Sequence, residues 1–425
     1  MIRSTKNYYL NLNPGKRSQI YDFLSAYQSA LNSCINFIWH NSFYDQNNTL
    51  CWNIQQDILD LPKFLDYNTV DWNNSQLSAR CKSSILTQAI GIVKGSVGKR
   101  KHLLYIINKR TSENLSVDKF KKSLDKASIS KPIIRNCLAE LSSKNIDIQK
   151  SAGFFEYWIR IRSTNLPEIK VPIKLSKMDR KWINKNGNML AGISIGNNYL
   201  QLRYDIPEKK RSEGITLGCD TGIKTPVSLS NQTKPLSSVD NHGHTLENIQ
   251  KKLSRKRKGS NSFRKAQVHR TNYVNWFVNQ LNLDGVQKVN LENVSFIGEK
   301  VSRYSSHWVH GEIKGKILSR CEELGVQVSL HNSGYYSQRC SKCGLVLKSN
   351  RKGKEYSCKG CGNKIDSDLN SAINHERELP EIPFGIRQRG MNKEGFYWVE
   401  IGVCLYEAGQ EYRVPDTSLL KRIEL

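Results

Sequence analysis

Three acidic residues in the second half of the chain stand where they could carry chemistry. Asp220 closes the segment ITLGCD and Glu292 lies in VQKVNLENV, and apolar residues alternate before each acid as in a strand with one buried face. Asp368 lies near the start of the helical segment DSDLNSAINHERE. A capping or turn-forming role is the more common one for any single acid in such a place. Three acids on two strand ends and one helix start of a single α/β layer instead predict a site for hard cations, which prefer oxygen ligands.

The chemistry of such a site is phosphodiester hydrolysis. Two Mg²⁺ ions about 3.5 to 4 Å apart activate a water molecule and stabilise the leaving oxygen. We therefore predict that Asp220, Glu292 and Asp368 are catalytic and bind two Mg²⁺ ions, with Mn²⁺ as an alternative.

Four of the eleven cysteines form two closely spaced pairs. CSKC contains Cys340 and Cys343, and CKGC, after a gap of fourteen residues, contains Cys358 and Cys361. Paired thiolates at this spacing match tetrahedral Zn²⁺, and four protein ligands leave no open position, so we predict a structural zinc ribbon. Unrelated thiols or two disulfides are the alternatives; the other cysteines are scattered, which favours a reducing compartment. Six basic residues lie in the ribbon, as phosphate contacts or as a solvated surface: Lys342, Lys348, Arg351, Lys352, Lys354 and Lys359.

The elements that must position these residues alternate along the chain. ITLGCD, TPVSLSN, VQKVNLENV and VQVSLHN have the pattern of strands, residues 246–283 form a long basic helical region, and residues 305–324 form a helix. This order predicts an α/β layer with a mixed sheet. After it, the tail contains one strand-like stretch, GFYWVEIGVCLYEAG.

The first half of the chain has a different pattern. Residues 7–13 alternate like a strand, and residues 17–40 and about 75–110 are helical in pattern. Strand-like stretches follow between 154 and 206, with a hairpin turn at 196–198. We expect a helical lobe inserted into a small β domain whose first strand is the amino-terminal segment.

The charge of the chain points to a polyanionic partner. Lys and Arg number 65 against 38 Asp and Glu, which gives a net charge of +27 and a pI of about 9.6. Neutralised phosphates release counterions, so nucleic acid is the expected partner. A membrane is not expected, because no run of eighteen apolar residues and no signal peptide is found. The expected location is the cytoplasm of a prokaryotic or phage host cell, in association with the nucleoid.

Several motifs together resemble a known family. GCDTGIK, VNLENV, and SQRCSKCG with KGCGNKIDSDLNSAIN resemble, in this order, the three RuvC segments and the zinc ribbon of transposon-encoded TnpB and of the miniature type V-F CRISPR effectors. The resemblance covers about half the chain, from Gly214 to Asn374. It implies an RNA-guided DNA endonuclease whose catalytic acids correspond to Asp220, Glu292 and Asp368, and it leaves Asp366 as a local cap.

The family also has a long basic helix between the first two RuvC segments, and KKLSRKRKGSNSFRKAQVHR fills that place. It contains no acid, which suits the phosphates of a guide RNA or heteroduplex, whereas a solvated helix would interleave both signs. The predicted nucleic-acid-binding residues are Lys251, Lys252, Arg255, Lys256, Arg257, Lys258, Arg264, Lys265 and Arg270, with Lys99, Arg100 and Lys101 from the first half.

Three features depart from the family pattern. Cys219 and Thr221 flank the first acid where the family more often has an aliphatic residue and Leu. The loop DNHGHT, with His242 and His244, has no assigned role, and surface histidines are expected there. The tail after Glu378 is longer than usual and is expected to fold back on the nuclease domain or to contact nucleic acid or a second copy.

The predicted fold is a multi-domain α+β protein. It consists of a β-barrel-like wedge domain with an inserted helical recognition lobe, then an RNase H-like (RuvC) α/β domain with an inserted four-cysteine zinc ribbon. The predicted segments are 1–16 (first wedge strand), 17–150 (recognition lobe), 151–208 (wedge), 209–335 (first part of the nuclease domain), 336–364 (zinc ribbon), 365–378 (last nuclease helix) and 379–425 (tail).

The expected function is cleavage of target DNA by two-metal hydrolysis, with a guide RNA pairing to one strand and the protein reading a short flanking duplex motif. Three rivals stay open: a guided DNA-binding protein without cleavage, an unguided nuclease of the RuvC or RNase H kind, and a zinc-ribbon regulator without a catalytic site. The sequence leaves undecided the origin of the guide (transposon end or CRISPR array), the flanking motif and the choice between monomer and homodimer.

Overall fold

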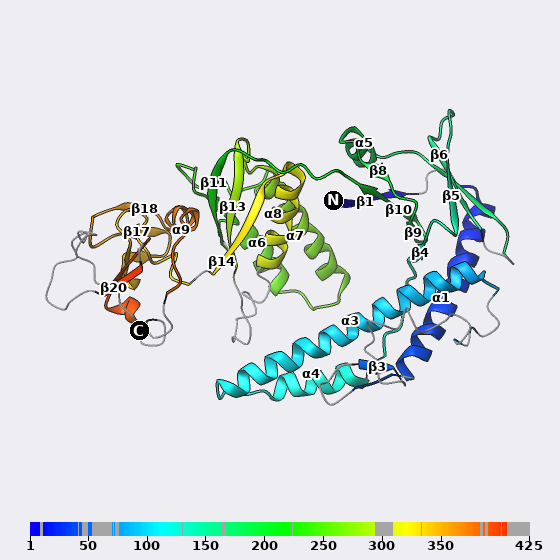
Figure 1. Cartoon of the computed structure of the whole chain (residues 1–425), viewed down its shortest axis with the longest axis horizontal. Helices are drawn as coiled ribbons and strands as arrows, with labels where there is room; N and C mark the ends of the chain where they lie inside the picture. The colour runs from blue at the N-terminus through cyan, green and yellow to red at the C-terminus, as the bar shows by residue number, and fades with distance from the viewer. Residues whose placement is uncertain are drawn as a thin grey trace. The chain divides into compact units, whose positions relative to one another are not determined.

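The computed structural model of the 425-residue chain is shown in Figure 1. It divides into two compact units, Met1–Pro207 and Glu208–Leu425. The structure describes residues 1–8, 12–40, 42–44, 50–52, 70, 72, 76–129, 131–162, 166–222, 224–293, 309–332, 334–382, 386, 390–400 and 402–405. Among these residues, no helix is both long enough and apolar enough to cross a membrane.

The first unit contains an open five-stranded sheet in which the earliest strand pairs with one of the latest. Strand β1 is antiparallel to β10 along its whole length, from Ile2 opposite Asp205 to Tyr8 opposite Tyr199. The sheet continues through β9 to β4, and β8 also pairs with β10. The bounds are β1 (Ile2–Tyr8), β4 (Ala139–Leu141), β8 (Asn188–Met189), β9 (Ile193–Ile195) and β10 (Tyr199–Asp205). The hairpin turn expected at 196–198 joins β9 to β10.

A second, three-stranded antiparallel sheet follows the order β5-β6-β7, with β5 (Ile146–Lys150), β6 (Tyr157–Ile161) and β7 (Ile169–Ile173). A barrel requires continuous hydrogen bonding around a closed ring of strands. Within the described residues no strand pairing joins this sheet to the first, so both remain open. The expectation of a barrel-like domain was wrong in this respect.

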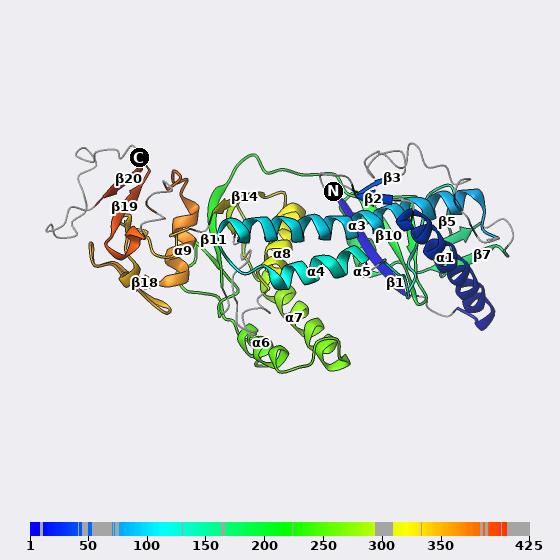
Figure 2. The same ribbon diagram turned by 90° about the horizontal axis from the view of Figure 1, so that it is seen from below.

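The helices of this unit pack on one another and on the first sheet. Helix α1 begins earlier than expected because the side chain of Asn13 accepts a hydrogen bond from the Lys16 backbone N–H (2.8 Å) and Pro14 fits a first helical turn. Tyr27 donates to the Glu140 carbonyl (3.0 Å), which ties α1 to β4. Helix α4 runs beside α3 (Figure 2). The bounds are α1 (Pro14–His40), α3 (Ala79–Ser112), α4 (Asp118–Ile129) and α5 (Lys177–Asn184), with a small hairpin of β2 (Ser42–Tyr44) and β3 (Leu50–Trp52).

The second unit is built on a mixed four-stranded sheet in the order β12-β11-β13-β14. The strands are β11 (Ile215–Thr221), β12 (Val227–Leu229), β13 (Val286–Asn293) and β14 (Gln327–Asn332). Strands β11, β13 and β14 are parallel, and β12 is antiparallel to β11. Because the three parallel strands end at the same edge, residues at their carboxyl ends are brought together.

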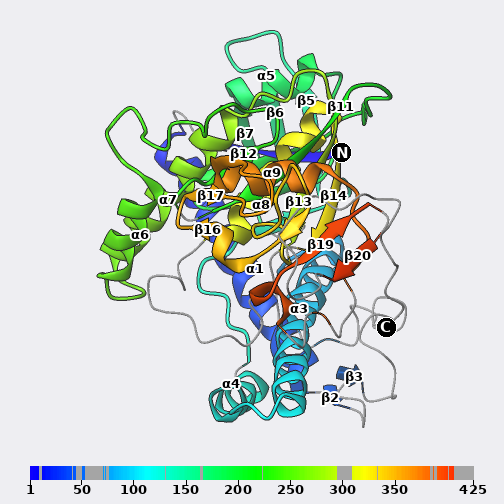
Figure 3. The ribbon, with the colours of Figure 1, turned by 90° about the vertical axis from the view of Figure 1, so that its left-hand side faces the viewer.

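Alternation along these strands gives the sheet two different faces. Leu217, Cys219 and Leu291 pack into an apolar core with side chains of three helices, α6 (Leu246–Ser254), α7 (Asn261–Asn279) and α8 (His310–Leu324). The opposite face carries Gly218, and helix α9 (Ser367–Glu376) lies across it, in front of β11 and β13 in Figure 3. A Cβ on Gly218 would lie 1.9 Å from the Ala372 carbonyl oxygen, so only glycine allows this approach.

The basic region is two helices rather than the single long helical stretch that was expected. Helix α6 ends at Ser254 and α7 begins after Ser260, whose side chain accepts from the Phe263 backbone N–H (3.1 Å) and caps the second helix. Gly259 in the turn has a φ of 85°, which suits glycine and breaks the helical path.

The cysteine-rich segment forms two small sheets, and part of the tail joins one of them. Strands β16, β17 and β18 form one sheet, while β15 pairs with the tail hairpin of β19 and β20. The tail therefore folds back on the cysteine-rich segment, and the one strand-like stretch expected there is a hairpin; residues 406–425 lie outside the described residues. The bounds are β15 (Leu345–Val346), η4 (Lys348–Asn350), β16 (Arg351–Lys352), β17 (Glu355–Ser357), β18 (Lys364–Asp366), η5 (Met391–Lys393), β19 (Phe396–Val399) and β20 (Gly402–Leu405).

Candidate active site

Asp220 and Glu292 meet at the carboxyl ends of β11 and β13. Cys219 stands opposite Leu291 in the parallel pairing, so the next residue on each strand is an acid and both acids face α9. One carboxylate oxygen from each lies within 4.8 Å of the other and of a ring nitrogen of His375. The structure thus brings together two of the three predicted acids and adds a histidine.

The pKa values of both carboxyl groups are raised, chiefly by burial. The enclosed position of the Asp220 carboxyl and its proximity to Glu292 raise the pKa of Asp220 to about 8. Hydrogen bonding from Ser371 and the charges of Arg351 and Lys354 act in the opposite direction. Burial also raises the pKa of Glu292, which is 6% exposed. A close pair of this kind favours a bound proton or a bound cation over two free negative charges.

Glu292 is held by its neighbour on the adjacent strand. Its Oε1 accepts from the Thr221 backbone N–H (3.0 Å) and from the Thr221 hydroxyl. The same hydroxyl lies 2.8 Å from Nδ1 of the buried His310, the first residue of α8. Sequence reasoning noted Thr221 only as a departure from a family pattern; a hydroxyl directly after a strand-end acid was the signal that could have revealed this role.

Asp368 lies in the first turn of α9, slightly apart from the first two acids. Its carboxylate accepts from Lys354 Nζ and is 3.7 Å from Arg351 Nη2, so two cations of the cysteine-rich segment bind it. Asp368 is outside the group of ligand atoms formed by Asp220, Glu292 and His375. One helical turn further on, Ser371 donates to Asp220 Oδ1 (2.7 Å), and this bond joins the acid-bearing face of α9 to the strand end.

Asp366 is the cap of α9, as expected. Its Oδ1 accepts from the backbone N–H groups of Asp368 (2.9 Å) and Leu369 (3.2 Å). These bonds satisfy two of the free amides at the helix start and fix where Asp368 lies.

His375 is a site residue that sequence reasoning missed. It follows Asp368 by two helical turns, so both project from one face of α9. The side chain is fully buried, and its ring stacks on Tyr336 with a centroid distance of 4.2 Å and an interplanar angle of 11°. Burial and the nearby His331 lower the pKa of His375 to about 3, which keeps the imidazole neutral. The spacing along DSDLNSAINHE was the available signal.

The four predicted cysteines form a second candidate metal site. Their Sγ atoms all lie within 4.8 Å of one another, with Cys340 3.6 Å from Cys361 and Cys343 3.6 Å from Cys358. A tetrahedral ion with metal–sulfur bonds of about 2.3 Å requires sulfur atoms about 3.8 Å apart. The residues present therefore fit a tetrahedral thiolate-bound metal.

Two equivalent turns shape this cluster. The Gly344 N–H donates to the Cys340 carbonyl and the Gly362 N–H to the Cys358 carbonyl, both at 2.9 Å. The φ angles of Gly344 and Gly362 are 81° and 71°, a conformation that favours glycine. Each CxxC pair is thus preformed by its own glycine turn.

The predicted nucleic-acid-binding residues have three different surroundings. Arg270 is turned inward and pairs with Glu312 of α8 (3.5 Å), and Lys251 pairs with Glu247 (2.9 Å). The side chains of Lys99, Arg100 and Lys101, on α3, lie outside the described residues. Lys256 is half-buried, whereas the remaining basic side chains of α6, α7 and their turn are exposed: Lys252, Arg255, Arg257, Lys258, Arg264 and Lys265. His242 and His244 are exposed as expected.

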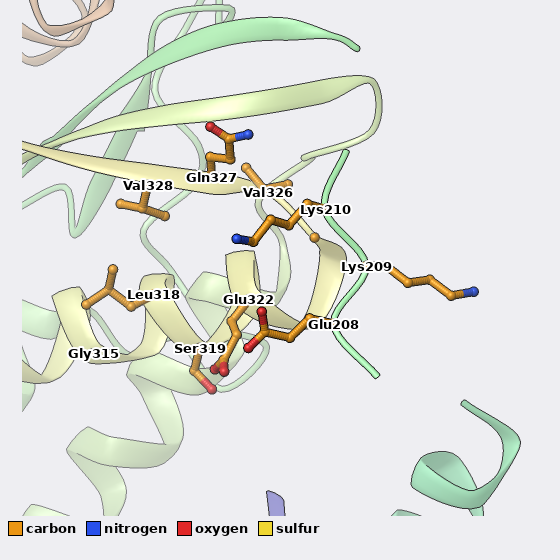
Figure 4. Close-up of a pocket in the computed structure, with 11 residues that line it drawn as sticks. Glu208, Lys209, Lys210, Gly315, Leu318, Ser319, Glu322, Val326, Gln327 and Val328 are labelled. Atoms are coloured by element: carbon orange, nitrogen blue, oxygen red, sulfur yellow. The ribbon is translucent and has the colours of Figure 1, made fainter. Parts of the chain in front are cut away.

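A pocket of about 460 Å³ lies at the other end of β14, between that strand, α8 and the segment that precedes β11 (Figure 4). Glu208, Lys210, Leu318, Glu322 and Val328 are among the residues that line it. It contains none of the predicted site residues.

Comparisons with known proteins match the segment that carries part of this site. Residues 310–375, from α8 through the cysteine cluster to His375, match the family model described as "Cas12f1-like, TNB domain". The CRISPR-associated endodeoxyribonuclease Cas12f1 of Sulfoacidibacillus thermotolerans is 30% identical over 209 residues, which are 41% of this chain and 49% of that protein. The matched segment spans about half the length of this curated relative.

Solved structures extend the likeness to the fold. The AacC2c1–sgRNA binary complex has a TM-score of 0.55 at 8% identity and covers 88% of this chain and 89% of that one. The Cas12f1–sgRNA–target DNA complex has a TM-score of 0.50 at 15% identity, with 85% and 82% covered. The chain therefore has the multi-domain α+β fold of Cas12 effectors. Within this class, the sequence matches relate it to Cas12f1, and they confirm the predicted resemblance to the miniature type V-F, TnpB-like effectors.

Proposed function

We propose that the chain is an RNA-guided DNA endonuclease that cleaves target DNA at a RuvC-type site formed by Asp220, Glu292 and Asp368. The observation that carries the proposal is the meeting of the half-buried Asp220 and the buried Glu292 at adjacent strand ends. A helix packed over them adds a third acid, Asp368, which two cations of the cysteine-rich segment bind. The names of the relatives, an endodeoxyribonuclease Cas12f1 and a Cas12f1–sgRNA–target DNA complex, support the same activity and partners.

The domains follow from this assignment. We assign segments 1–16 and 151–208 to a wedge domain and 17–150 to a recognition lobe. Segments 209–335 and 365–378 form an RNase H-like nuclease domain, 336–364 a zinc ribbon and 379–425 the tail. The four-cysteine cluster binds structural Zn²⁺, because it offers four thiolates and no open position.

Several residues of the site hold the catalytic acids in position or add positive charge beside them. When bound, two Mg²⁺ or Mn²⁺ ions would supply water activation and stabilisation of the leaving oxygen. Ser371 orients Asp220, and Thr221 orients Glu292 through two hydrogen bonds. Arg351 and Lys354 add positive charge beside Asp368, which favours the approach of a phosphodiester.

The guide supplies sequence recognition in this proposal. Base pairing between guide RNA and one DNA strand selects the target, while the protein reads a short flanking motif in duplex DNA. The exposed cations of α6, α7 and their turn contact phosphates of the guide or heteroduplex.

The test is cleavage of a target duplex by the purified chain with its guide RNA and Mg²⁺. Asp220→Ala, Glu292→Ala and Asp368→Ala are each expected to lower cleavage by more than about 100-fold, because a lost ligand costs more than a lost supporting residue. Guide-dependent DNA binding should persist in all three variants. Asp366→Asn is the matched control, because asparagine caps a helix as well as aspartate and only the charge is lost.

The same experiment separates the rivals. If the Asp220→Ala variant cleaves the target as well as the parent chain does, Asp220 is not a catalytic residue. Guide-dependent binding without cleavage by the parent chain would indicate a guided binding protein, and cleavage that needs no RNA would indicate an unguided nuclease. Sequencing the RNA that co-purifies with the protein identifies the origin of the guide.

A further inference from the structure

The imidazole of His375 is buried without a hydrogen bond. Its side chain is 0% exposed, and neither Nδ1 nor Nε2 has a hydrogen-bond partner within the part of the chain that the structure describes. Buried polar atoms nearly always have partners, since an unpaired one costs free energy. The presence of two such atoms in one ring therefore requires an explanation.

Packing explains the shape of this side chain but not its nitrogens. Tyr336 stacks on the ring at 4.2 Å, and a flat ring is what that contact needs. A phenylalanine would meet the same need with no polar atom to bury. The nitrogens therefore point to a ligand rather than to the core.

One nitrogen of the ring lies close to the carboxylate pair. A ring nitrogen lies within 4.8 Å of a carboxylate oxygen of Asp220 and of one of Glu292. Helix α9 holds the ring there rigidly, because its backbone lies directly against Gly218 and the Glu376 carbonyl accepts from the Asn290 side chain (3.3 Å). In one of its two tautomers, an imidazole in this position would offer the lone pair of this nitrogen to a bound cation.

We propose that His375 is a nitrogen ligand of the divalent cation bound by Asp220 and Glu292. The proposal deepens the nuclease function above and rests on it. Ligand atoms about 2.0 to 2.2 Å from a shared ion lie up to about 4 Å apart, and the observed spacing reaches this with small side-chain rotations. Asp368, bound by Arg351 and Lys354, then belongs to the second cation position.

A nitrogen ligand changes which ions the position prefers. Imidazole suits the later first-row metals, whereas carboxylate and water suit Mg²⁺. A position with one imidazole and two carboxylates therefore binds Mn²⁺ or Co²⁺ more tightly, relative to Mg²⁺, than an all-oxygen position does.

The direct test is electron spin-echo envelope modulation of Mn²⁺ added to the full chain, with the cysteine cluster preloaded with Zn²⁺ and any histidine tag removed. We expect ¹⁴N coupling from a directly bound imidazole in the parent chain. The coupling should vanish in His375→Phe and persist in His331→Phe. His331 is the matched control because it stands opposite Glu292 in the pairing of β13 and β14. If the ¹⁴N coupling is lost in His331→Phe but retained in His375→Phe, the proposal is wrong.

Affinity gives a second readout. His375→Phe should weaken Mn²⁺ binding by about tenfold or more, while Mg²⁺ affinity, measured by competition, falls by a smaller factor. Circular dichroism melts in the absence of Mn²⁺ and Mg²⁺ establish that the variants fold. If His375→Phe fails to fold, the spectrum of the parent chain still decides, since a spectrum without ¹⁴N coupling refutes the ligand.

The experiments separate a failure of this inference from a failure of the proposed nuclease function. If Mn²⁺ binding depends on Asp220 and Glu292 but the spectrum contains no ¹⁴N coupling, His375 is not a ligand. The proposed nuclease site is unaffected by that result. If the parent chain binds no Mn²⁺, or if Asp220→Asn and Glu292→Gln leave binding unchanged, the carboxylate site and this inference both fall.

Discussion

Thr221 links the two halves of the acid pair. It follows Asp220 on β11, and it donates to Glu292 on β13 through its backbone and its hydroxyl. The hydroxyl also contacts His310. The Thr221 side chain therefore connects β11, β13 and α8. The orientation of Glu292 thus depends on a residue of the neighbouring strand.

Replacement of Thr221 by valine is expected to lower cleavage by about 10- to 100-fold, because Glu292 loses its orienting hydroxyl in a buried site. Thr221→Ser keeps the hydroxyl and should restore most of the activity. Cleavage rates for both variants at saturating guide and target check this. Equal loss in the serine and valine variants would mean that packing of the methyl group, rather than the hydrogen bond, matters.

Asp220 should make the cation-free protein less stable at higher pH. Its pKa of about 8 lies above the ordinary value of about 4, so between these values the folded state holds a proton that the unfolded chain has lost. The free energy of unfolding therefore falls as pH rises from about 4 to 8.

Asp220→Asn should remove this slope and raise Tm most at pH 8, as thermal melts in EDTA-treated, Zn²⁺-restored protein would show. Asp240→Asn is the control. The pKa of Asp240 is lowered, chiefly by hydrogen bonds from the His244 and His242 backbone, so its contribution is constant above pH 5. An unchanged slope in Asp220→Asn would contradict the raised pKa.

Sequence alone located the acids better than it located their partners. Asp220 and Glu292 were recognisable because alternation before each residue marks a strand end. Thr221, Ser371 and His375 were not assigned roles, since each acts through contacts with residues far away in the sequence. The catalytic roles of the three acids, and Asp368 in particular, stay predictions until cleavage is measured.

At the scale of elements, α9 determines the geometry of the site. Its backbone lies against β11 at Gly218, and the helix carries Asp368, Ser371 and His375 on the face turned to the strand ends. A displaced helix would move all three together.

Gly218→Ala should therefore destabilise the second unit by at least about 2 kcal/mol and abolish cleavage, because the new methyl group overlaps the α9 backbone. Hydrogen exchange of the α9 amides measures the local loss. Gly315→Ala on α8 is the control, since its Cβ would meet nothing within 4 Å and alanine favours helix by about 1 kcal/mol. Normal protection of α9 in Gly218→Ala would show that the helix can shift without cost.

Metal removal should loosen the tail as well as the cysteine cluster. Strand β19 of the tail pairs with β15, which lies between the two CxxC pairs. A chelator that removes the metal, or Cys358→Ser, is expected to increase hydrogen exchange in β15, β19 and β20 together and to weaken cleavage, since Arg351 and Lys354 lose their support. Cys404→Ser, which alters a cysteine of the hairpin itself, is the control and should retain the bound metal.

Elements were predicted well where the pattern was local. The strands of the mixed sheet and α9 follow from the sequence pattern. The break between α6 and α7, the open sheets of the first unit and the pairing of β19 with β15 depend on a turn glycine or on long-range pairing, which periodicity does not report.

At the scale of the whole molecule, the charge of +27 should control binding to the guide. The variant Arg257→Gln, Lys258→Gln, Lys265→Gln removes three exposed charges near the α6–α7 turn. Guide RNA affinity should fall, and the slope of log K against log salt should decrease by about 2, because each cation contributes roughly 0.7 to 0.9. Filter binding at several salt concentrations measures this.

Arg270→Gln is the matched comparison for that variant. Arg270 pairs with Glu312, so its loss should lower stability and leave the salt slope unchanged. Identical slopes for the triple variant and the parent would exclude this surface from the RNA interface.

The pairing of β1 with β10 has a consequence for biosynthesis. The first strand leaves the ribosome early, yet its partner begins at Tyr199, and β10 is its only neighbour in the sheet among the described strands. At about 5 to 20 residues per second, translation of the intervening segment takes roughly 10 to 40 s. During that interval the backbone groups of the amino-terminal segment can pair only with water, so the first sheet is completed only after β10 has been made.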